Sequence, residues 1–231
     1  VHTKTSLGVI PCGSGNGFAR HIGIPMDVKK AIDFINKAEH TKIDYGKLND
    51  IPFFCACGVG FDALVSNDFA KGNTRGLASY VQKTLIDWVN YKPEVYEVVV
   101  DSVKKKYKAF LIACGNASQY GNNAFITPFA SMRDGLLSVS VLKPFTPVDV
   151  PLIVLQLFSN TLDKNSHLTT ISARKITIKR KNAAPVHYDG EPAVMDAELN
   201  IEVVPDGLKV LVSPGWDGTC DPLPLYKQLF D

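Results

Sequence analysis

The sequence predicts an α+β fold, in which a partial α/β unit of the nucleotide-domain kind is followed by an antiparallel β-sandwich-like domain with helices. A glycine-rich loop lies between a short apolar run and a helical pattern near the start of the chain. From about residue 41, many short strand patterns alternate with turn signals, as in sandwiches. The 231 residues are 45% hydrophobic and 21% charged, which is enough for one large domain or two small ones.

Composition excludes several classes of protein. A net charge of +2 is too small to indicate a nucleic-acid partner. The five cysteines are an odd number and mostly lie in apolar runs, so we expect free thiols in a cytoplasmic setting. The start of the chain has no signal-peptide pattern, and the longest apolar stretch, Val148 to Phe158, contains Pro151 and is too short to cross a bilayer. We expect a soluble protein that touches a membrane surface at most transiently.

The N-terminal unit reads as strand, loop and helix. Ser6 to Pro11 is expected to form a short buried strand, and a helix should follow Pro25 with Val28, Ile32 and Ile35 on one face. One such unit cannot form a doubly wound sheet by itself. We therefore expect residues 1–40 to be the C-terminal remnant of an α/β nucleotide-binding domain, and residues 211–231 are a candidate to return to it.

Residues 41–210 are expected to form one β-rich domain. Its first predicted elements are a hairpin of Ile43–Leu48 and Phe53–Gly58 around residues 49–52, a helix over Gly76–Asn90, and strands over Val95–Val100 and Tyr107–Cys114. The apolar stripe of that helix is expected to pack on a sheet, with a lipid-facing surface as the alternative. Lys104 to Lys106 are expected in a solvated turn.

The second half of this region continues the pattern. Leu137, Val139 and Val141 alternate with serines, which predicts a half-buried strand. Val148–Phe158 is expected to be a buried helix with Thr146 as its cap and Pro147 at its first position. The remaining predicted strands are Ile171–Lys179, Val186–Tyr188, and a final pair over residues 199–203 and 208–212 that turns through Pro205-Asp206-Gly207.

The glycine-rich loop is the first candidate for chemistry. Gly13, Gly15 and Gly17 alternate with Ser14 and Asn16. Glycines at this spacing let backbone N–H groups converge ahead of a helix, and the side chains of Ser14 and Asn16 add donors, which suits a phosphate or another anion. The loop is neither a Walker A motif nor a GxGxxG fingerprint, and a plain tight turn explains it equally well.

Two acidic turns are the other candidates. Asp134 lies in an Asp-Gly pair before a strand, a pattern that is usually only a turn. Asp189 and Glu191 flank Gly190 directly after a strand, and two such carboxylates can hold a metal ion or accept a proton from a hydroxyl. Surface turns of this composition are as common as functional ones. His187 is expected to be a packed or solvent-facing residue, with tuning of Glu191 as the alternative.

Four motifs occur together in this order. They are GSGNGFAR from Gly13, GFDA at residues 60–63, P-x-A-x-x-x-DGLL at residues 128–137, and DGEP at residues 189–192. Together they resemble the diacylglycerol kinase and sphingosine kinase catalytic family, with bacterial soluble lipid kinases as the most similar type. The resemblance runs from about Thr5 to Pro214. Four short motifs in register are much more specific than any one of them.

The resemblance implies roles for the catalytic and nucleotide residues. Glu191 corresponds to the expected proton acceptor from the lipid hydroxyl, with Asp189 beside it. The cofactor would be ATP with Mg²⁺, and its phosphate region would lie against Gly13, Ser14, Gly15 and Asn16.

The resemblance also implies a metal site and a substrate residue. Asp134, with the backbone carbonyls of Ser131 and Leu136, would hold a structural magnesium ion. Oxygen-only ligands are what this hard cation prefers. Asp62 is expected to face the lipid. The partners implied are a lipid alcohol, such as diacylglycerol or a sphingoid base, and a peripheral membrane contact; no signal sets an oligomeric state.

The chain departs from the family in one respect. The family's Gly-Gly-Asp-Gly-Thr motif should precede the Gly13 loop and is not present. Asp217-Gly218-Thr219 is not its equivalent, since Trp216 stands in place of the second glycine. We therefore expect a fragment with little kinase activity of its own, from a parent enzyme that transfers the ATP γ-phosphate to a lipid hydroxyl. An NAD kinase-related enzyme and a non-catalytic lipid-binding module are the alternatives.

Overall fold

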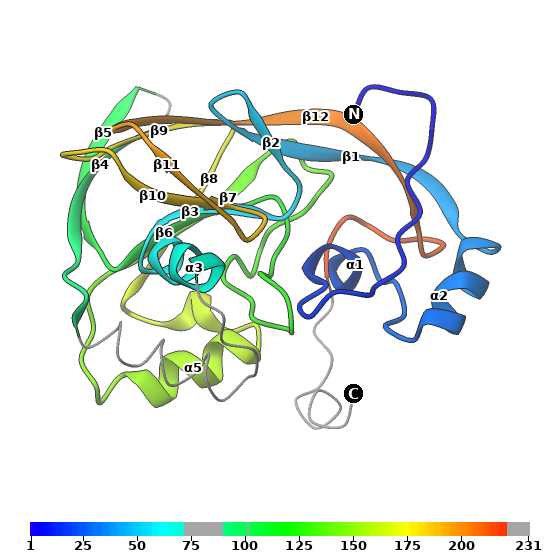
Figure 1. Ribbon diagram of the computed structural model, residues 1–231, viewed down its shortest axis with the longest axis horizontal. Coiled ribbons are helices and arrows are strands. Elements are labelled where there is room, and N and C mark those ends of the chain that lie inside the picture. The colour runs from blue at the N-terminus through cyan, green and yellow to red at the C-terminus, as the bar shows by residue number, and fades with distance from the viewer. Residues whose placement is uncertain (72–89, 101, 221–231) are drawn as a thin grey trace.

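Two antiparallel sheets form most of the molecule in the computed structural model, which describes residues 1–71, 90–100 and 102–220 (Figure 1). The first sheet has the order β2-β1-β12-β9-β4-β5, with β1 Glu39–Leu48, β2 Ile51–Phe53, β4 Glu94–Val100, β5 Val103–Ala109, β9 Lys175–Lys179 and β12 Glu198–Val212. The second has the order β11-β10-β3-β6-β7-β8, with β3 Ala56–Gly60, β6 Leu111–Gly115, β7 Leu137–Leu142, β8 Leu168–Ala173, β10 Ala184–Tyr188 and β11 Glu191–Met195.

The helices are few and short in the described part of the chain. They are α1 Gly17–His21, α2 Val28–Ile35, α3 Phe61–Lys71, α5 Val150–Phe158 and the 3₁₀ turn η1 Leu162–Lys164. None of the helices described is long and apolar enough to cross a membrane. The predicted helix over Gly76–Asn90 falls almost wholly on residues 72–89, outside the described residues.

The core explains why the sheets stack. Alternate residues of each strand point into a shared apolar layer, to which Tyr96 and Ile178 come from the first sheet and Ile112 and Val139 from the second. Burying apolar area of this kind is the main favourable term in folding. The predicted α+β class with a sandwich-like domain is therefore confirmed.

The β1–β12 pair connects the sandwich to the N-terminal unit. The two long strands run along the top of Figure 1 from the sandwich to the region of α1 and α2. Ile43 and Val210, at that far end, belong to a second apolar cluster that includes Ala19 and Ala31. Leu7 pairs in parallel with Val210, so residues near both ends of the chain lie side by side.

The predicted hairpin through residues 205–207 is wrong, because β12 continues through it as one strand. Its partner β1 shifts register between Ile43 and Tyr45. Asp206 adopts a left-handed conformation with φ 53°, and its N–H donates to the Asp44 carboxylate at 2.9 Å. The turn-type residues thus form an irregularity opposite Asp44 instead of a chain reversal.

Several further expectations are corrected. Ser6–Pro11 is not a buried strand, since only one bridge forms there and Leu7 is 45% exposed. The inward side of α2 carries Ala31, while Val28 and Ile32 are exposed. The first sheet's hairpin ends at Phe53, after which the chain crosses to the other sheet as β3.

The later strands and α5 also differ from expectation. The serines of β7 are buried like their apolar neighbours, and the Ser140 hydroxyl donates to the Ile126 carbonyl at 2.6 Å. The lysines at 104–106 lie in β5 and not in the turn. Helix α5 begins after Asp149, whose carboxylate accepts bonds from Thr146, and it is mostly exposed instead of buried.

Arg180 fastens the β10–β11 hairpin to the end of β9. Its guanidinium is buried and donates to the backbone carbonyls of Ala184, Pro185, Met195 and Asp196 at 2.7–3.2 Å. These carbonyls lie at the open end of the hairpin whose tip is the Asp189-Gly190-Glu191 turn. One side chain therefore joins both strands of the hairpin to the opposite sheet.

We expect Arg180→Met to lower the free energy of unfolding by about 3 kcal/mol, because several buried carbonyls lose their donors at once. Lys181→Met, at the exposed neighbouring position, is the matched control and should change it by less than about 0.5 kcal/mol. Urea unfolding of both variants measures the difference. Equal stability of the two variants would contradict the role given to Arg180.

Candidate functional site

The glycine-rich loop is closed by one of its own side chains. Asn16 has a left-handed backbone, with φ 50°. Its side-chain oxygen accepts the Gly13 N–H at 3.0 Å, and its side-chain amide donates to the Gly13 carbonyl at 2.8 Å. Asn16 therefore shapes the loop, while Gly13 and Ser14 remain exposed at its tip, just ahead of α1.

A second turn holds this loop from behind. The Asn122 N–H donates to the Gly15 carbonyl at 2.9 Å. A Cβ atom at Gly17 would lie only 2.8 Å from the Tyr120 carbonyl oxygen, so the two backbones approach too closely for any side chain. Glycine at 17 is required by this contact, which fixes the phosphate-loop candidate against residues 120–122.

The Asp189 carboxylate caps three successive backbone amides. It accepts the N–H groups of Phe54 and Cys55 at 2.7 Å each and that of Ala56 at 3.1 Å. The residue as a whole is exposed, but its carboxylate is turned away from water toward these amides. Loss of water around the carboxylate raises the pKa of Asp189, and the three N–H bonds oppose that rise. Asp189 therefore anchors the turn, while Glu191 is exposed at its far side, at the start of β11.

The capped segment also touches the N-terminal unit. The Phe54 ring lies edge-on to the Phe18 ring of α1, with 6.4 Å between centroids. The side-chain amide of Asn116 donates to the carbonyls of both Phe54 and Asp44 at 2.9 Å. The Asp189 turn and helix α1, which follows the glycine loop, thus both contact one short segment, residues 54–56.

A buried polar group lies on the other side of this segment. The Asp62 carboxylate accepts the Tyr120 hydroxyl at 2.6 Å and lies 3.0 Å from Nε2 of His187. The side chains of His187 and Asp62 are only 3% and 9% exposed, and Gly58 leaves room for them. Burial and then the Asp62 charge raise the pKa of Tyr120. This group joins β10 and α3 to the turn that holds the glycine loop.

Asp134 lies near the carboxylate of Asp44, a residue that is in none of the four sequence motifs. The Asp134 carboxylate accepts the Leu136 N–H at 2.9 Å, while the buried Asp44 accepts the Gly135 N–H at 2.8 Å. Burial and the nearby Asp44 charge raise the pKa of Asp134. The only signal for Asp44 in the sequence is an acid in the middle of an apolar strand pattern.

The carboxylates of Asp134 and Asp44 suit a hard cation, because two neighbouring negative charges repel each other and a bound cation offsets that repulsion. The carbonyls of Ser131 and Leu136 stay a prediction of the sequence as further ligands. Across the described residues, no group of three or more His, Cys, Asp and Glu side chains is placed to hold a metal. A magnesium ion here would therefore depend on these two carboxylates and on backbone oxygens.

The Asp217-Gly218-Thr219 segment has a structural role. Asp217 accepts bonds from the Thr219 N–H and hydroxyl, which closes a local turn. The Gly218 carbonyl lies 3.1 Å from Nε2 of His21, whose Nδ1 accepts the Ser118 N–H at 3.1 Å. His21 is therefore neutral, with its proton on Nε2, and it ties α1 to the C-terminal segment.

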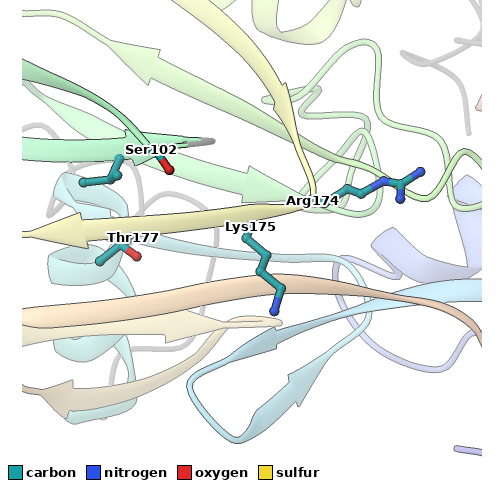
Figure 2. Close-up of a pocket in the computed structure, with 5 residues that line it drawn as sticks. Ser102, Arg174, Lys175 and Thr177 are labelled. Carbon is teal, nitrogen blue, oxygen red and sulfur yellow. The ribbon is translucent and has the colours of Figure 1, made fainter.

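Neither of two surface hollows is lined by the glycine loop, Asp62, Asp134, Asp189 or Glu191. The first, of about 430 Å³, lies on the outer face of β4 and β9, and Figure 2 shows Arg174 and Lys175 pointing in different directions at its edge. The second, of about 290 Å³, lies between α1 and the C-terminal segment, next to His21 and Trp216. The candidate site is therefore identified by its hydrogen bonds and not by its shape.

Known proteins match this chain in two parts. The family model "YegS C-terminal NAD kinase beta sandwich-like domain" matches residues 55–212, and "Diacylglycerol kinase catalytic domain" matches residues 1–48. A "Probable lipid kinase YegS-like" of Chromohalobacter salexigens is 26% identical over 82% of this chain and 62% of its own length. Another of that description, from Yersinia enterocolitica, is 27% identical over 91% of this chain and 71% of its own length. The chain thus spans 62% and 71% of these two relatives.

Solved structures agree with the fold. The crystal structure of a "putative diacylglycerol kinase" from Bacillus anthracis superimposes with a TM-score of 0.71 and 21% identity, over 93% of this chain and 71% of that one. A second diacylglycerol kinase structure from the same organism gives 0.70 at 17% identity. The two-sheet architecture is therefore shared with these proteins.

We expect acid to weaken the protein through His21. Burial lowers the pKa of His21 from 6.5 to about 4, so the unfolded chain binds this proton first as the pH falls. The stabilising contribution is complete above pH 6.5 and is lost as the pH falls toward 4, a change of about 3 kcal/mol. Urea unfolding between pH 7 and 4 should show this slope in the parent and not in His21→Gln. An NMR titration of the His21 ring near pH 6.5 would contradict it.

Proposed function

This chain belongs to the family of the YegS C-terminal NAD kinase beta sandwich-like domain, and from that premise we propose that it is the larger part of an ATP-dependent lipid kinase. The reaction would transfer the γ-phosphate of ATP to the hydroxyl of a lipid alcohol. The observation that carries the proposal is the cap of Asp189 on residues 54–56, since that segment also contacts the helix of the glycine loop.

The proposed mechanism divides the work between two turns. Glu191, exposed and next to the anchored Asp189, would accept the proton of the attacking lipid hydroxyl. Gly13, Ser14 and the backbone amides of the glycine loop would hold the phosphates. Phosphoryl transfer depends mainly on positioning and on offsetting charge, and the contacts of residues 54–56 with both α1 and the Asp189 turn would supply the positioning.

The proposal also includes a magnesium ion at the Asp134 and Asp44 carboxylates. Asp134 and Asp44, with carbonyl oxygens of Ser131 and Leu136, would hold it, and the bound ion would offset their mutual repulsion. Their backbone bonds to Leu136 and Gly135 keep this loop in one conformation.

The lipid is proposed to lie near Asp62. The aromatic side chains of Phe61, Phe110 and Tyr120 form an apolar cluster next to that carboxylate. An apolar region with one buried acceptor suits an acyl chain that carries a hydroxyl group. Diacylglycerol and a sphingoid base both have this character.

An NAD kinase-related activity is the second candidate, because the matching family description names the NAD kinase sandwich. The two proposals differ in the acceptor. Radioactive phosphate transfer from ATP should be measured with diacylglycerol, sphingosine and NAD, using a version of the protein extended to the length of its relatives. Transfer to NAD alone would favour the second candidate, and lipid capture without transfer would favour a binding module.

We expect Glu191→Gln to lower kcat for lipid phosphorylation by about 100-fold or more in that extended version, because an amide cannot accept the hydroxyl proton. The KM for ATP should change little, since Glu191 does not contact the nucleotide in this proposal. Glu198→Gln is the matched control, as Glu198 is exposed on β12 and pairs with Lys179 at the surface. Wild-type kcat in Glu191→Gln would remove Glu191 from the mechanism.

Magnesium should stabilise the folded protein through Asp134. At free Mg²⁺ about 100 times its Kd, linkage predicts about 2.7 kcal/mol of added stability, seen as a rise in Tm. Asp134→Asn should abolish the rise, whereas Asp33→Asn, at an exposed position on α2, should retain it. An equal rise in both variants would place the ion elsewhere.

A further inference from the structure

Helix α5 presents apolar side chains to solvent around most of its circumference. Ile153 is its only fully buried side chain, at 7% exposure. The exposed fractions are 53% for Leu152, 45% for Val154 and 55% for Leu155, and Val148 just before the helix reaches 86%. A surface helix of a globular protein normally carries polar residues on its outer face. This one does not, which marks it as an interaction surface.

The only acidic side chain at the start of this helix is already engaged. The Asp149 carboxylate accepts the N–H and the hydroxyl of Thr146 at 2.8 and 2.7 Å, and it lies 3.7 Å from Nε2 of His167. Those two hydrogen bonds, followed by His167, lower the pKa of Asp149. Its charge is thus held close to the protein and partly offset.

Cations flank both ends of α5. Lys143 lies before it and Lys164, in η1, lies after it, and both are exposed. Asp163 is the neighbouring acid and is only partly exposed. An apolar helix bordered by exposed lysines is complementary to a bilayer with anionic headgroups, where each lysine near the surface adds attraction.

The buried side of α5 leads toward the candidate lipid site. Ile153 and Leu157 pack into the same cluster as Phe110 and Tyr120. The Tyr120 hydroxyl binds Asp62. One apolar layer therefore separates the exposed helix from the residue that we place next to the substrate. In Figure 1, α5 lies at the edge of the molecule opposite the β1–β12 pair.

We propose that α5, together with Val148, docks the protein on the surface of an anionic lipid bilayer. Helix α5 lies in the plane of the headgroups, with Leu152, Val154 and Leu155 among the upper acyl chains and the flanking lysines at the phosphates. This proposal rests on the proposed function in one respect, since docking on a bilayer gives a lipid kinase access to a substrate that is itself in the bilayer.

The test is vesicle binding by the 231-residue chain, without nucleotide. Co-sedimentation with phosphatidylcholine vesicles containing phosphatidylglycerol should show binding, and Leu152→Glu/Leu155→Glu should lower the partition coefficient at least about tenfold. Val103→Glu is the matched control, because Val103 is 69% exposed on β5 of the other sheet. It should bind like the parent.

A second measurement reports where the helix lies. Leu155→Trp should gain fluorescence quenching by brominated lipids relative to the parent, and circular dichroism should show that every variant is folded. Equal binding by parent and double-glutamate variant, or no binding by the parent, overturns the proposal. The proposal is also overturned if the parent forms a dimer and, of the variants, only the double-glutamate variant is monomeric, since α5 would then bind a second copy of the chain. If the chain binds vesicles but the extended protein phosphorylates no lipid, the result counts against the proposed kinase activity and not against the docking surface.

Discussion

The arrangement of the candidate site depends on the carboxylate of Asp189 and the three backbone amides that it caps. Phe54 and Cys55 lie between β2 of the first sheet and β3 of the second, and Ala56 is the first residue of β3. A backbone N–H that is removed from water without an acceptor is costly, and the Asp189 side chain accepts all three. The same cap fixes the turn that carries Glu191. The need of three backbone N–H groups for an acceptor therefore sets the position of a candidate catalytic residue.

The same region shows how closely packed turns can serve chemistry. Asn116 bonds the backbone beside this cap to that of Asp44, and Tyr120 joins the glycine loop to Asp62 and His187. The contacts of Asn116 and Asp62 are hydrogen bonds between buried or partly buried groups, and the contact at Gly17 is a close approach of two backbones. Together they fix geometry more than they add stability. Catalysis by positioning requires such rigidity, since small displacements of reacting groups are expensive.

Local patterns in the sequence predicted the sandwich class, the glycine loop and the two acidic turns, because each rests on neighbouring residues. Features with distant partners were not predictable in the same way. Pro205-Asp206-Gly207 reads as a hairpin turn, yet Asp44, far away in the chain, accepts the Asp206 N–H and the strand continues. Tyr120 has no distinguishing pattern in the sequence, and its role follows from the backbone approach at Gly17 and from its hydroxyl bond to Asp62. Helix α5 has the composition of a buried helix, and only its place at the surface reveals the exposed side chains.

If the proposed function is right, the glycine loop and the turn of Glu191 face one nucleotide. Paramagnetic relaxation by Mn²⁺–ATP, measured on the ¹⁵N-labelled protein extended to the length of its relatives, tests this arrangement. We expect strong broadening of the amides of both Gly13–Gly17 and Gly190–Glu191, with the outer face of β9 around Thr177 unaffected. Broadening of the glycine loop while Gly190 and Glu191 stay sharp would contradict it.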